Sequence, residues 1–308
     1  MKLFLALLYK IIPLYITIAL GYILSHYFGL KREKIAWLLI YILGPIVMFF
    51  ATLSIEFKAE ILFLPIFVFI FGSSLAFFTL WYYKKDWQDA SINTLAFTNG
   101  TGNTGYFGIP LAMLLLEPQL ANIFIFATLA SLLYENTTGF YVTAKSNFSA
   151  RDALKKILKL PLIYAIILGL TLNINGYSIP DFIVPHFETL KWIYGILGMM
   201  MLGMGMKGFT KNDIDFKYIK VAYFYKFIFW PLSFLLVIFL DIWFFNFLGR
   251  DIHQVLFLFS IVPLAGNTVT LAILLNAKPE KASFTVLLST LISVVYIPVV
   301  LSAFYLFF

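Results

Sequence analysis

Long apolar runs separated by short polar segments make up almost the whole chain. A membrane-spanning helix needs about 20 mostly apolar residues in succession. Ten stretches fit that length, at residues 3–25, 34–54, 61–83, 91–116, 121–144, 157–174, 187–206, 218–243, 252–275 and 282–306. The pattern predicts an all-α polytopic membrane protein with ten transmembrane helices.

Composition agrees with this class. The chain is 62% hydrophobic and 12% charged, whereas soluble domains are about a quarter charged. The first apolar run lacks a small-residue cleavage site, so we interpret it as a span and not as a removed signal peptide. The absence of Cys excludes disulfides and thiolate metal sites. The net charge of +7 lies in short loops between apolar runs, which is typical of membrane topology signals. We therefore expect membrane lipid as the surrounding partner and no nucleic acid.

The basic residues also predict an orientation. With the N-terminus outside, the cytoplasmic loops hold 16 Lys and Arg residues: Lys31, Arg32, Lys34, Lys84, Lys85, Lys145, Arg151, Lys155, Lys156, Lys159, Lys207, Lys211, Lys217, Lys220, Lys278 and Lys281. The outer segments hold 4: Lys2, Lys58, Lys191 and Arg250. Basic residues collect on the cytoplasmic side of membrane proteins. We expect a multi-pass protein of the cytoplasmic (inner or plasma) membrane with both termini outside.

Two apolar spans carry a polar interruption. Residues 98–110 and 261–270 both contain Gly-Asn-Thr, at 102–104 and 266–268. In a helix Gly costs about 1 kcal/mol and Pro about 3 kcal/mol relative to Ala. Broken backbone at membrane depth is tolerated only inside protein or facing a wet cavity. One break in each half of the chain points to a transporter binding site.

The two halves share further features. Pro13, Tyr15 and Gly21 in the first span correspond to Pro161, Tyr164 and Gly169 in the sixth, and Trp37 and Gly44 correspond to Trp192 and Gly198. We interpret residues 1–144 and 157–308 as two five-helix repeats joined by a cytoplasmic linker, residues 145–156. Because five spans is an odd number, the second repeat enters the membrane inverted, and the broken fourth and ninth helices cross.

Crossed half-helices predict an anion site. Helix N-termini carry about half a positive charge and unpaired N–H groups, which suit a carboxylate. The candidate substrate-binding residues come from the two breaks: Asn99, Gly102, Asn103, Thr104, Gly105, Pro263, Gly266, Asn267 and Thr268. The alternative is that these residues only cap the kinks.

Two charged residues lie inside predicted spans as candidates for proton or charge coupling. Glu135 is near the middle of the fifth span, where a charge costs at least about 2.5–3.5 kcal/mol, so it is a candidate proton carrier or a packing residue. Lys226 in the eighth span is either a counter-charge for the substrate or a side chain that snorkels to the interface. Asp241 is expected to be solvated at an outer span end. The Met- and Gly-rich segment 195–206 is either a surface that slides or a helix of the protein interior.

No enzyme or metal pattern accompanies these residues. His26, His186 and His253 have no metal-ligand spacing, and HExxH, GxSxG and Walker-type motifs are absent from the sequence. We expect no enzyme activity, no metal site and no cofactor, with H⁺ or Na⁺ as candidate coupling ions.

The sequence resembles the auxin efflux carrier family, which includes PIN-type exporters and bacterial malonate- or malate-type relatives. The most specific part of the resemblance is the motif formed by Asn103, Gly105, Gly108 and Pro110. Two further segments also resemble the family: Pro13–Gly21, and Pro263 through Lys281-Ala282-Ser283 followed by Ser289-Thr290 and Pro298. It implies two inverted five-helix repeats with crossed fourth and ninth helices, as in bile-acid symporters and sodium/proton antiporters. It also implies elevator-type alternating access, a homodimer, and a site lined by Asn103 and Gly266-Asn267-Thr268. The long central loop of many plant members is absent, and Glu135 has no counterpart carried over from the family.

The sequence thus predicts a secondary active transporter of a small carboxylate. A sodium-coupled symporter, a passive channel and a non-transporting sensor are the alternatives. A mono-acid, a dicarboxylate and an indole acid all suit the predicted site, and import and export are equally open.

Overall fold

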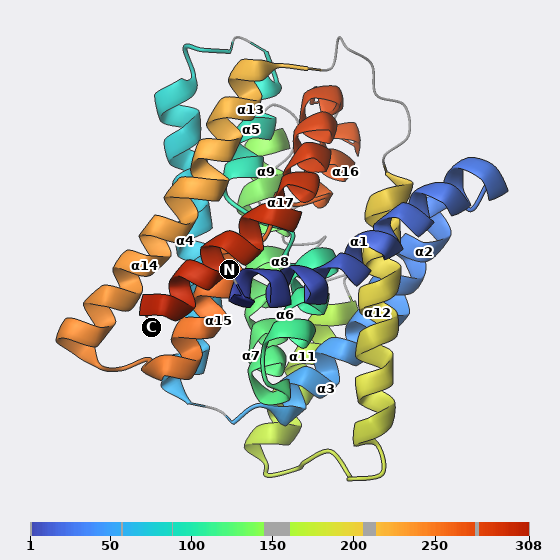
Figure 1. Cartoon of the computed structure of the whole chain (residues 1–308), viewed down its shortest axis with the longest axis vertical. Helices are drawn as coiled ribbons and strands as arrows, with labels where there is room; N and C mark the ends of the chain where they lie inside the picture. The colour runs from blue at the N-terminus through green and yellow to red at the C-terminus, as the bar shows by residue number, and fades with distance from the viewer. Residues whose placement is uncertain are drawn as a thin grey trace.

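The computed structural model describes residues 2–56, 58–87, 89–144, 161–205, 214–274 and 277–307. Within these ranges the chain is helical and contains no strand (Figure 1). The predicted linker 145–156 lies outside the described residues. The all-α prediction is therefore confirmed for the described part of the chain.

The described helices follow one another with short connections. They are α1 (Lys2–Phe28), α2 (Arg32–Leu38), α3 (Gly44–Ser54), α4 (Ala59–Tyr83), α5 (Ser91–Asn99), α6 (Ile109–Leu115), α7 (Pro118–Ala127), α8 (Leu129–Asn136), α9 (Thr138–Ala144), α11 (Pro161–Ile174), α12 (Val184–Met204), α13 (Phe216–Tyr223), α14 (Trp230–Leu240), α15 (Gly249–Ile261), α16 (Asn267–Leu274) and α17 (Pro279–Phe307). Short π-helical segments lie between some of them: η1 (Leu39–Leu43), η2 (Thr104–Gly108), η4 (Phe224–Phe229) and η5 (Asp241–Phe245).

Among the described residues, five continuous helical segments are long and apolar enough to cross a membrane. They are Lys2–Phe28, Glu33–Ser54, Ala59–Tyr83, Phe216–Phe245 and Lys281–Phe307. The protein is therefore a membrane protein, as the sequence predicts. The predicted seventh span corresponds to α12, which is continuous over 21 residues, and the remaining predicted spans correspond to shorter or interrupted helices. Ten spans in two inverted repeats stay a prediction.

The predicted fifth span is interrupted, which the apolar pattern did not reveal. Residues 121–144 form the end of α7, then α8 and α9, with turns at Thr128 and Thr137. Each threonine hydroxyl donates to a preceding carbonyl, of Ile125 and Leu133 respectively. Such side-chain bonds compete with the helix ladder and bend helices.

Helices from the two halves of the sequence pack closely. α1 lies against α12, and α3 against α11. A Cβ at Gly21 would lie 2.0 Å from the Met200 carbonyl oxygen, and one at Gly169 would lie 2.8 Å from that of Phe49. Only glycine permits helix backbones to approach so closely. Gly21 and Gly169 are one of the pairs that the repeat matches, and each contacts a helix of the other half.

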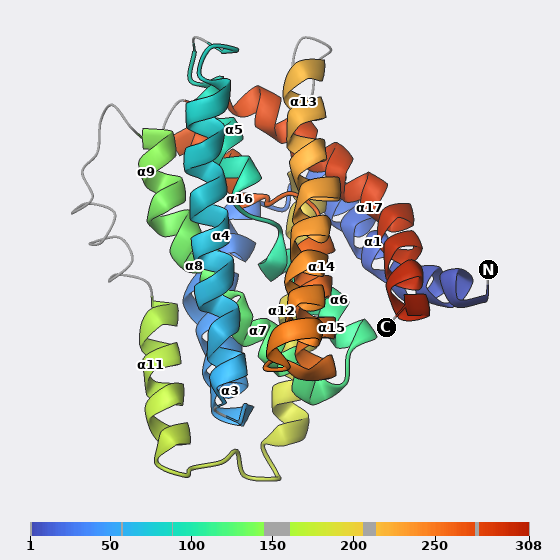
Figure 2. The ribbon, with the colours of Figure 1, turned by 90° about the vertical axis from the view of Figure 1, so that its left-hand side faces the viewer.

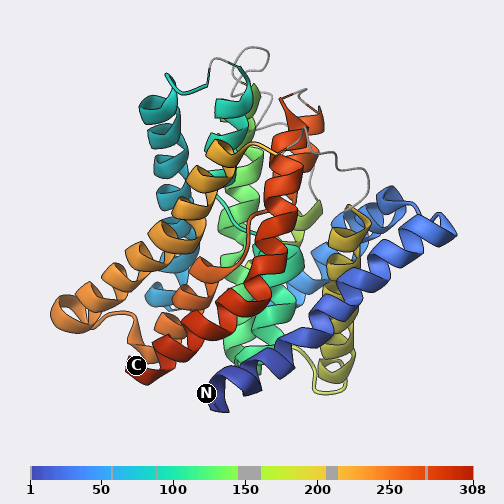
Figure 3. The same ribbon diagram turned by 45° about the horizontal axis from the view of Figure 1, so that its top comes forward.

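A second group of helices surrounds the two breaks. α4 packs on α5 and α8, α5 packs on α9, and α16 packs on α17. In Figure 2 the α3–α4 and α11–α12 connections lie at the bottom, whereas α5 and the start of α13 lie near the top. These are the ends that the basic residues assign to the outside and the cytoplasm, respectively. Figure 3 shows that both chain termini lie on the same side of the molecule.

Candidate functional site at the two helix breaks

Both predicted breaks are present, and they touch. The first helix stops at Asn99 and resumes at Thr104, and the second stops at Ile261 and resumes at Asn267. The N–H of Asn103 donates to the carbonyl of Pro263 across 2.8 Å. Each break thus satisfies a backbone group that the other leaves free, which lowers the cost of unwound backbone at this depth.

Glu135 connects the two breaks through its carboxyl group. It lies on α8, and Oε2 accepts a hydrogen bond of 2.7 Å from Nδ2 of Asn267. Oε1 accepts a longer one, 3.4 Å, from the hydroxyl of Thr101. The sequence placed Glu135 inside a span but did not connect it to the breaks. The structure brings it to both.

A cavity of about 260 Å³ lies beside the breaks. Of the predicted residues, those that line it are Gly102, Asn103, Thr104, Gly105, Glu135, Gly266 and Asn267. Further polar lining comes from Thr128, Ser131, Asn136 and Thr270, and aromatic lining from Phe97, Tyr106 and Tyr194. Among the described residues that line the cavity, Glu135 is the one that carries a charge.

The cavity extends to one end of the helices. Leu39 and Ile40 near the start of the predicted second span, Leu162 at the start of α11 and Leu271 near the end of α16 line it. The charge pattern assigns all of these helix ends to the cytoplasm. The cavity therefore reaches toward the predicted cytoplasmic side, while Met48, Thr128 and Tyr194 line it from the predicted outer halves of their spans.

Three of the predicted substrate-binding residues, Asn99, Pro263 and Thr268, do not line this cavity. The amide of Asn99 donates to Thr79, and its backbone carbonyl accepts a 2.8 Å bond from the Trp230 indole. The Pro263 carbonyl is occupied by Asn103, and the buried Thr268 hydroxyl has no hydrogen-bond partner among the described residues. Asn99 and Pro263 hold the breaks in place.

Sequence reasoning missed several lining residues, and one set carried a usable signal. Thr128, Ser131 and Glu135 are three and four residues apart and face the same cavity. That spacing places side chains on one helix face. The hydroxyl of Thr104 donates to that of Ser131 over 2.9 Å. By contrast, nothing in the local sequence distinguishes Tyr194 from the other aromatic residues of the chain.

Lys226 does not snorkel to the interface. The side chain is 1% exposed, and its Nζ has no hydrogen-bond partner among the described residues. Nζ lies 4.3 Å from the centre of the Trp230 ring. A Cβ at Gly102 would be 2.6 Å from the same nitrogen. Lys226 thus lies behind the first break and outside the cavity lining.

Two residues expected at the outer surface are buried. Asp241 accepts hydrogen bonds from the N–H groups of Phe247 and Leu248 and lies 2.8 Å from Nε2 of His253, so it is not simply solvated. Lys191 is 1% exposed, with Nζ 2.7 Å from Glu188 and 3.0 Å from Oδ1 of Asn122. The apolar pattern could not reveal partners that come from other turns and helices.

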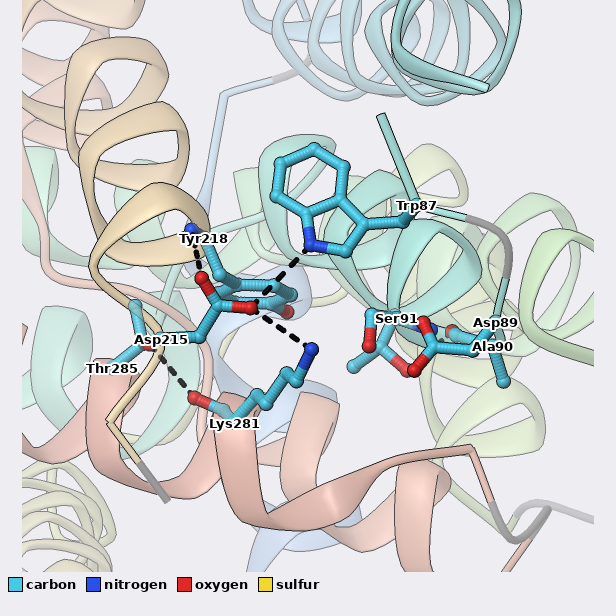
Figure 4. Close-up of polar contacts among 9 residues, drawn as sticks. Trp87, Asp89, Ala90, Ser91, Asp215, Tyr218, Lys281 and Thr285 are labelled. Carbon is cyan, nitrogen blue, oxygen red and sulfur yellow. Dashed lines mark hydrogen bonds and ion pairs between the residues drawn. The ribbon is translucent and has the colours of Figure 1, made fainter. Parts of the chain in front are cut away.

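A polar cluster supports the first break from the predicted cytoplasmic end (Figure 4). Asp215 accepts hydrogen bonds from the Tyr218 N–H at 3.0 Å and the Trp87 indole at 3.4 Å, and pairs with Lys281 at 2.9 Å. The Tyr218 hydroxyl is 2.9 Å from that of Thr98 on α5. Partial burial would raise the pKa of Asp215, but these hydrogen bonds and the Lys281 charge hold the pKa below its usual value.

In the part of the chain that the structure describes, no group of three or more His, Asp and Glu residues could hold a metal ion. No protein-family model matches the chain, and no curated protein matches it. The fold and the cavity themselves define the class: an α-helical membrane protein whose interrupted helices meet beside a largely apolar cavity that contains several polar side chains.

Proposed function

We propose that this protein is a secondary active transporter of a small organic anion, working by elevator-type alternating access around the two breaks. The observation that carries the proposal is the contact of two interrupted helices, through Asn103 and Pro263, beside a cavity that also holds Glu135. Interrupted helices at a midplane site are the arrangement by which many transporters bind their substrates.

Amide donors supply the recognition. Asn103 is 4% exposed and lines the cavity. Its side-chain nitrogen, Nδ2, has no hydrogen-bond partner among the described residues. An unpaired buried donor is costly, so a ligand oxygen that accepts from it gains that energy on binding. Nδ2 of Asn267 is the second donor, at the N-terminal end of α16, where the helix dipole also favours an anion.

Glu135 makes binding of an anion depend on a proton. Its carboxyl group already holds the Asn267 amide. A substrate carboxylate at that amide meets a second carboxyl group, and two such groups in contact do not both carry a negative charge. Substrate and proton therefore bind together, and Glu135 carries the proton.

Sodium coupling is a second candidate, favoured by the charge of the cavity. Among the described residues that line it, the one charged side chain is an acid. Carboxylate and carbonyl oxygens are suitable ligands for Na⁺, which would then replace the proton. Replacing Na⁺ by choline separates the two, since only sodium-coupled exchange stops.

Counterflow in proteoliposomes tests the proposal. Uptake of labelled malonate, malate and indole-3-acetate is compared with and without the same compound preloaded inside. We expect preloading to accelerate uptake of at least one, and Asn103→Ala to abolish the acceleration. Asn175→Ala is the matched control, because the exposed Asn175 follows the end of α11 and, among the described residues, its side-chain amide donates to the Thr171 carbonyl one turn earlier.

Other outcomes identify the alternatives. An uptake rate that is the same with and without preloading indicates a channel, and ligand binding without uptake indicates a sensor. Full exchange in both Asn103→Ala and Asn267→Ala would refute a site between the breaks. Glu135→Gln should retain binding and lose the pH dependence of exchange; an unchanged pH profile would assign Glu135 to structure and point to the nearby Tyr106 and Tyr194.

A further inference from the structure

Two groups of helices line the cavity, and they contribute unequally to its polar surface. The larger part of the lining comes from the two breaks and from α5, η2, α8 and α16. The rest comes from η1, α3, α11 and α12, through Leu39, Ile40, Met48, Leu162 and Tyr194. Of these five side chains, only that of Tyr194 has an O–H or N–H group. Among the described lining residues, the second group therefore offers one side-chain donor to the cavity.

Glycines let α12 approach the first break closely. Gly195 follows Tyr194, and Gly198 lies one turn further along α12. A Cβ at Gly195 would lie 3.0 Å from Cβ of Pro110, and one at Gly198 would lie 3.1 Å from Cα of Tyr106. Side chains at these positions would press α12 away from η2 and α6. The glycines thus hold Tyr194 next to the first break.

The hydroxyl of Tyr194 lies near the backbone of that break. Its oxygen is 3.7 Å from the position of a Cβ at Gly105, which itself lines the cavity. The ring lies beside that of Tyr106, with centroids 6.4 Å apart, and Glu135 is an electrostatic neighbour. The residues that the structure describes form no hydrogen bond with this hydroxyl. Its hydrogen-bonding capacity, one donor and two lone pairs, remains for a molecule in the cavity.

Lys191, one turn earlier on α12, is a polar group that the protein itself satisfies. Its ammonium group lies 2.7 Å from Glu188 and 3.0 Å from Oδ1 of Asn122. A ligand gains little from a donor that folding has already paired, and more from one that is unpaired. The two polar side chains of this part of α12 therefore have different roles, with Lys191 serving the fold.

A second unpaired donor borders the same part of the cavity. Asn103, whose Nδ2 has no partner among the described residues, is two residues before Gly105. Two residues of chain span at most about 7 Å, so the Asn103 amide and the Tyr194 hydroxyl border one short stretch of the first break. A carboxylate has two oxygens and can accept hydrogen bonds from two donors at once. A small anion in this cavity can therefore accept from both.

We propose that the Tyr194 hydroxyl is a substrate-binding group that donates a hydrogen bond to the bound anion from α12. This inference rests on the proposed function and extends its site to the second group of helices. Tyr194 then connects the anion to both groups, so a movement of one group past the other makes or breaks this bond. A ligand shifts a conformational equilibrium only through contacts that differ between the states, and Tyr194 supplies such a contact.

Ligand-induced Tm shifts of purified protein test the inference. Tyr194→Phe keeps the ring beside Tyr106 and removes only the hydroxyl. Without ligand we expect the wild-type Tm, because no hydrogen bond to the described residues is lost. With malonate, malate or indole-3-acetate, the affinity obtained from the Tm shift should fall about tenfold or more, as for a lost hydrogen bond to a charged group. Tyr177→Phe, an exposed tyrosine between α11 and α12, is the matched control and should bind as wild type does.

The outcomes separate this inference from the proposed function. If Tyr194→Phe binds with wild-type affinity every anion that the wild type binds, the inference is wrong and the proposed function stands. A lower Tm of Tyr194→Phe without ligand, together with unchanged affinity, would assign the hydroxyl to the stability of the fold. If the wild type binds none of the three anions, the proposed function fails and the inference fails with it.

Discussion

The two Gly-Asn-Thr tripeptides are identical in sequence and different in environment. A Cβ at Gly102 would meet Lys226 and Val262 at 2.6 and 2.9 Å, whereas one at Gly266 would meet only Leu202 at 3.4 Å. Asn103 is buried, and the side chain of Asn267 is exposed and bonded to Glu135. Residues of both tripeptides line the cavity, but the first tripeptide also packs against Lys226 and Val262, whereas the second contributes an exposed amide that is bonded to Glu135.

The threonines differ in the opposite way. Thr104 donates to Ser131, whereas the buried hydroxyl of Thr268 has no partner in the described part of the chain. A repeated motif thus supplies the same break twice, while the surrounding helices give each copy its own contacts. Matched substitutions at equivalent positions therefore measure the difference directly.

The asparagine pair should show the largest difference. Asn267→Ala removes a hydrogen bond to a charged group and should cost about 1.5–3 kcal/mol of stability without substrate. Asn103→Ala removes an amide whose Nδ2 is unpaired and should cost less, although both variants lose carboxylate binding. Thermal unfolding of the two purified variants checks this; a larger cost for Asn103→Ala would contradict the assigned environments.

The second-largest difference in stability is expected for the two glycines, Gly102 and Gly266. Gly102→Ala forces Lys226 or Val262 to move and should destabilise the protein by about 1–3 kcal/mol, as overpacking does. Gly266→Ala makes an ordinary van der Waals contact and should leave the Tm close to wild type. Equal stability of the two variants would show that Lys226 and Val262 move to accommodate the added methyl group at little cost in stability.

The threonine pair should give a smaller effect. Thr104→Val leaves the Ser131 hydroxyl without its hydrogen bond and should cost about 1 kcal/mol. Thr268→Val removes a buried hydroxyl that has no partner and should be neutral or stabilising. The free energies of unfolding of the two variants, measured side by side, decide whether the tripeptides differ here too.

The smallest change in stability is expected in the polar cluster of Asp215, Tyr218, Trp87 and Lys281, which contacts α5 near the first break. Asp215→Asn weakens the pair with Lys281 and should cost less than about 1 kcal/mol, because the pair is partly exposed. The pKa of Asp215 is held low in the folded protein, so its stabilising contribution is present above the unfolded-state pKa and is lost as pH falls through the folded-state pKa. A pH series of Tm values should show the wild type and Asp215→Asn converging in acid.

Sequence reasoning reached the helix breaks because their signal is local. Gly, Asn and Pro disfavour helix wherever they occur, and an apolar setting makes the interruption conspicuous. Glu135 was also visible, as a charge in an apolar run, but its bond to Asn267 joins residues 132 positions apart in the chain. No local pattern encodes such a contact.

The sequence by itself determined the membrane class, the helical content and the positions of the two breaks, because each depends on the solvation of a short stretch of chain. Only the tertiary structure decided which side chains meet there. Lys226 packs against a broken helix, whereas Lys191 pairs with Glu188 one turn earlier in α12 and with Asn122 of α7, a residue 69 positions away in the chain. The physical reason is that the compensation of a buried charge depends on the packing of distant helices, which forms only when the chain folds.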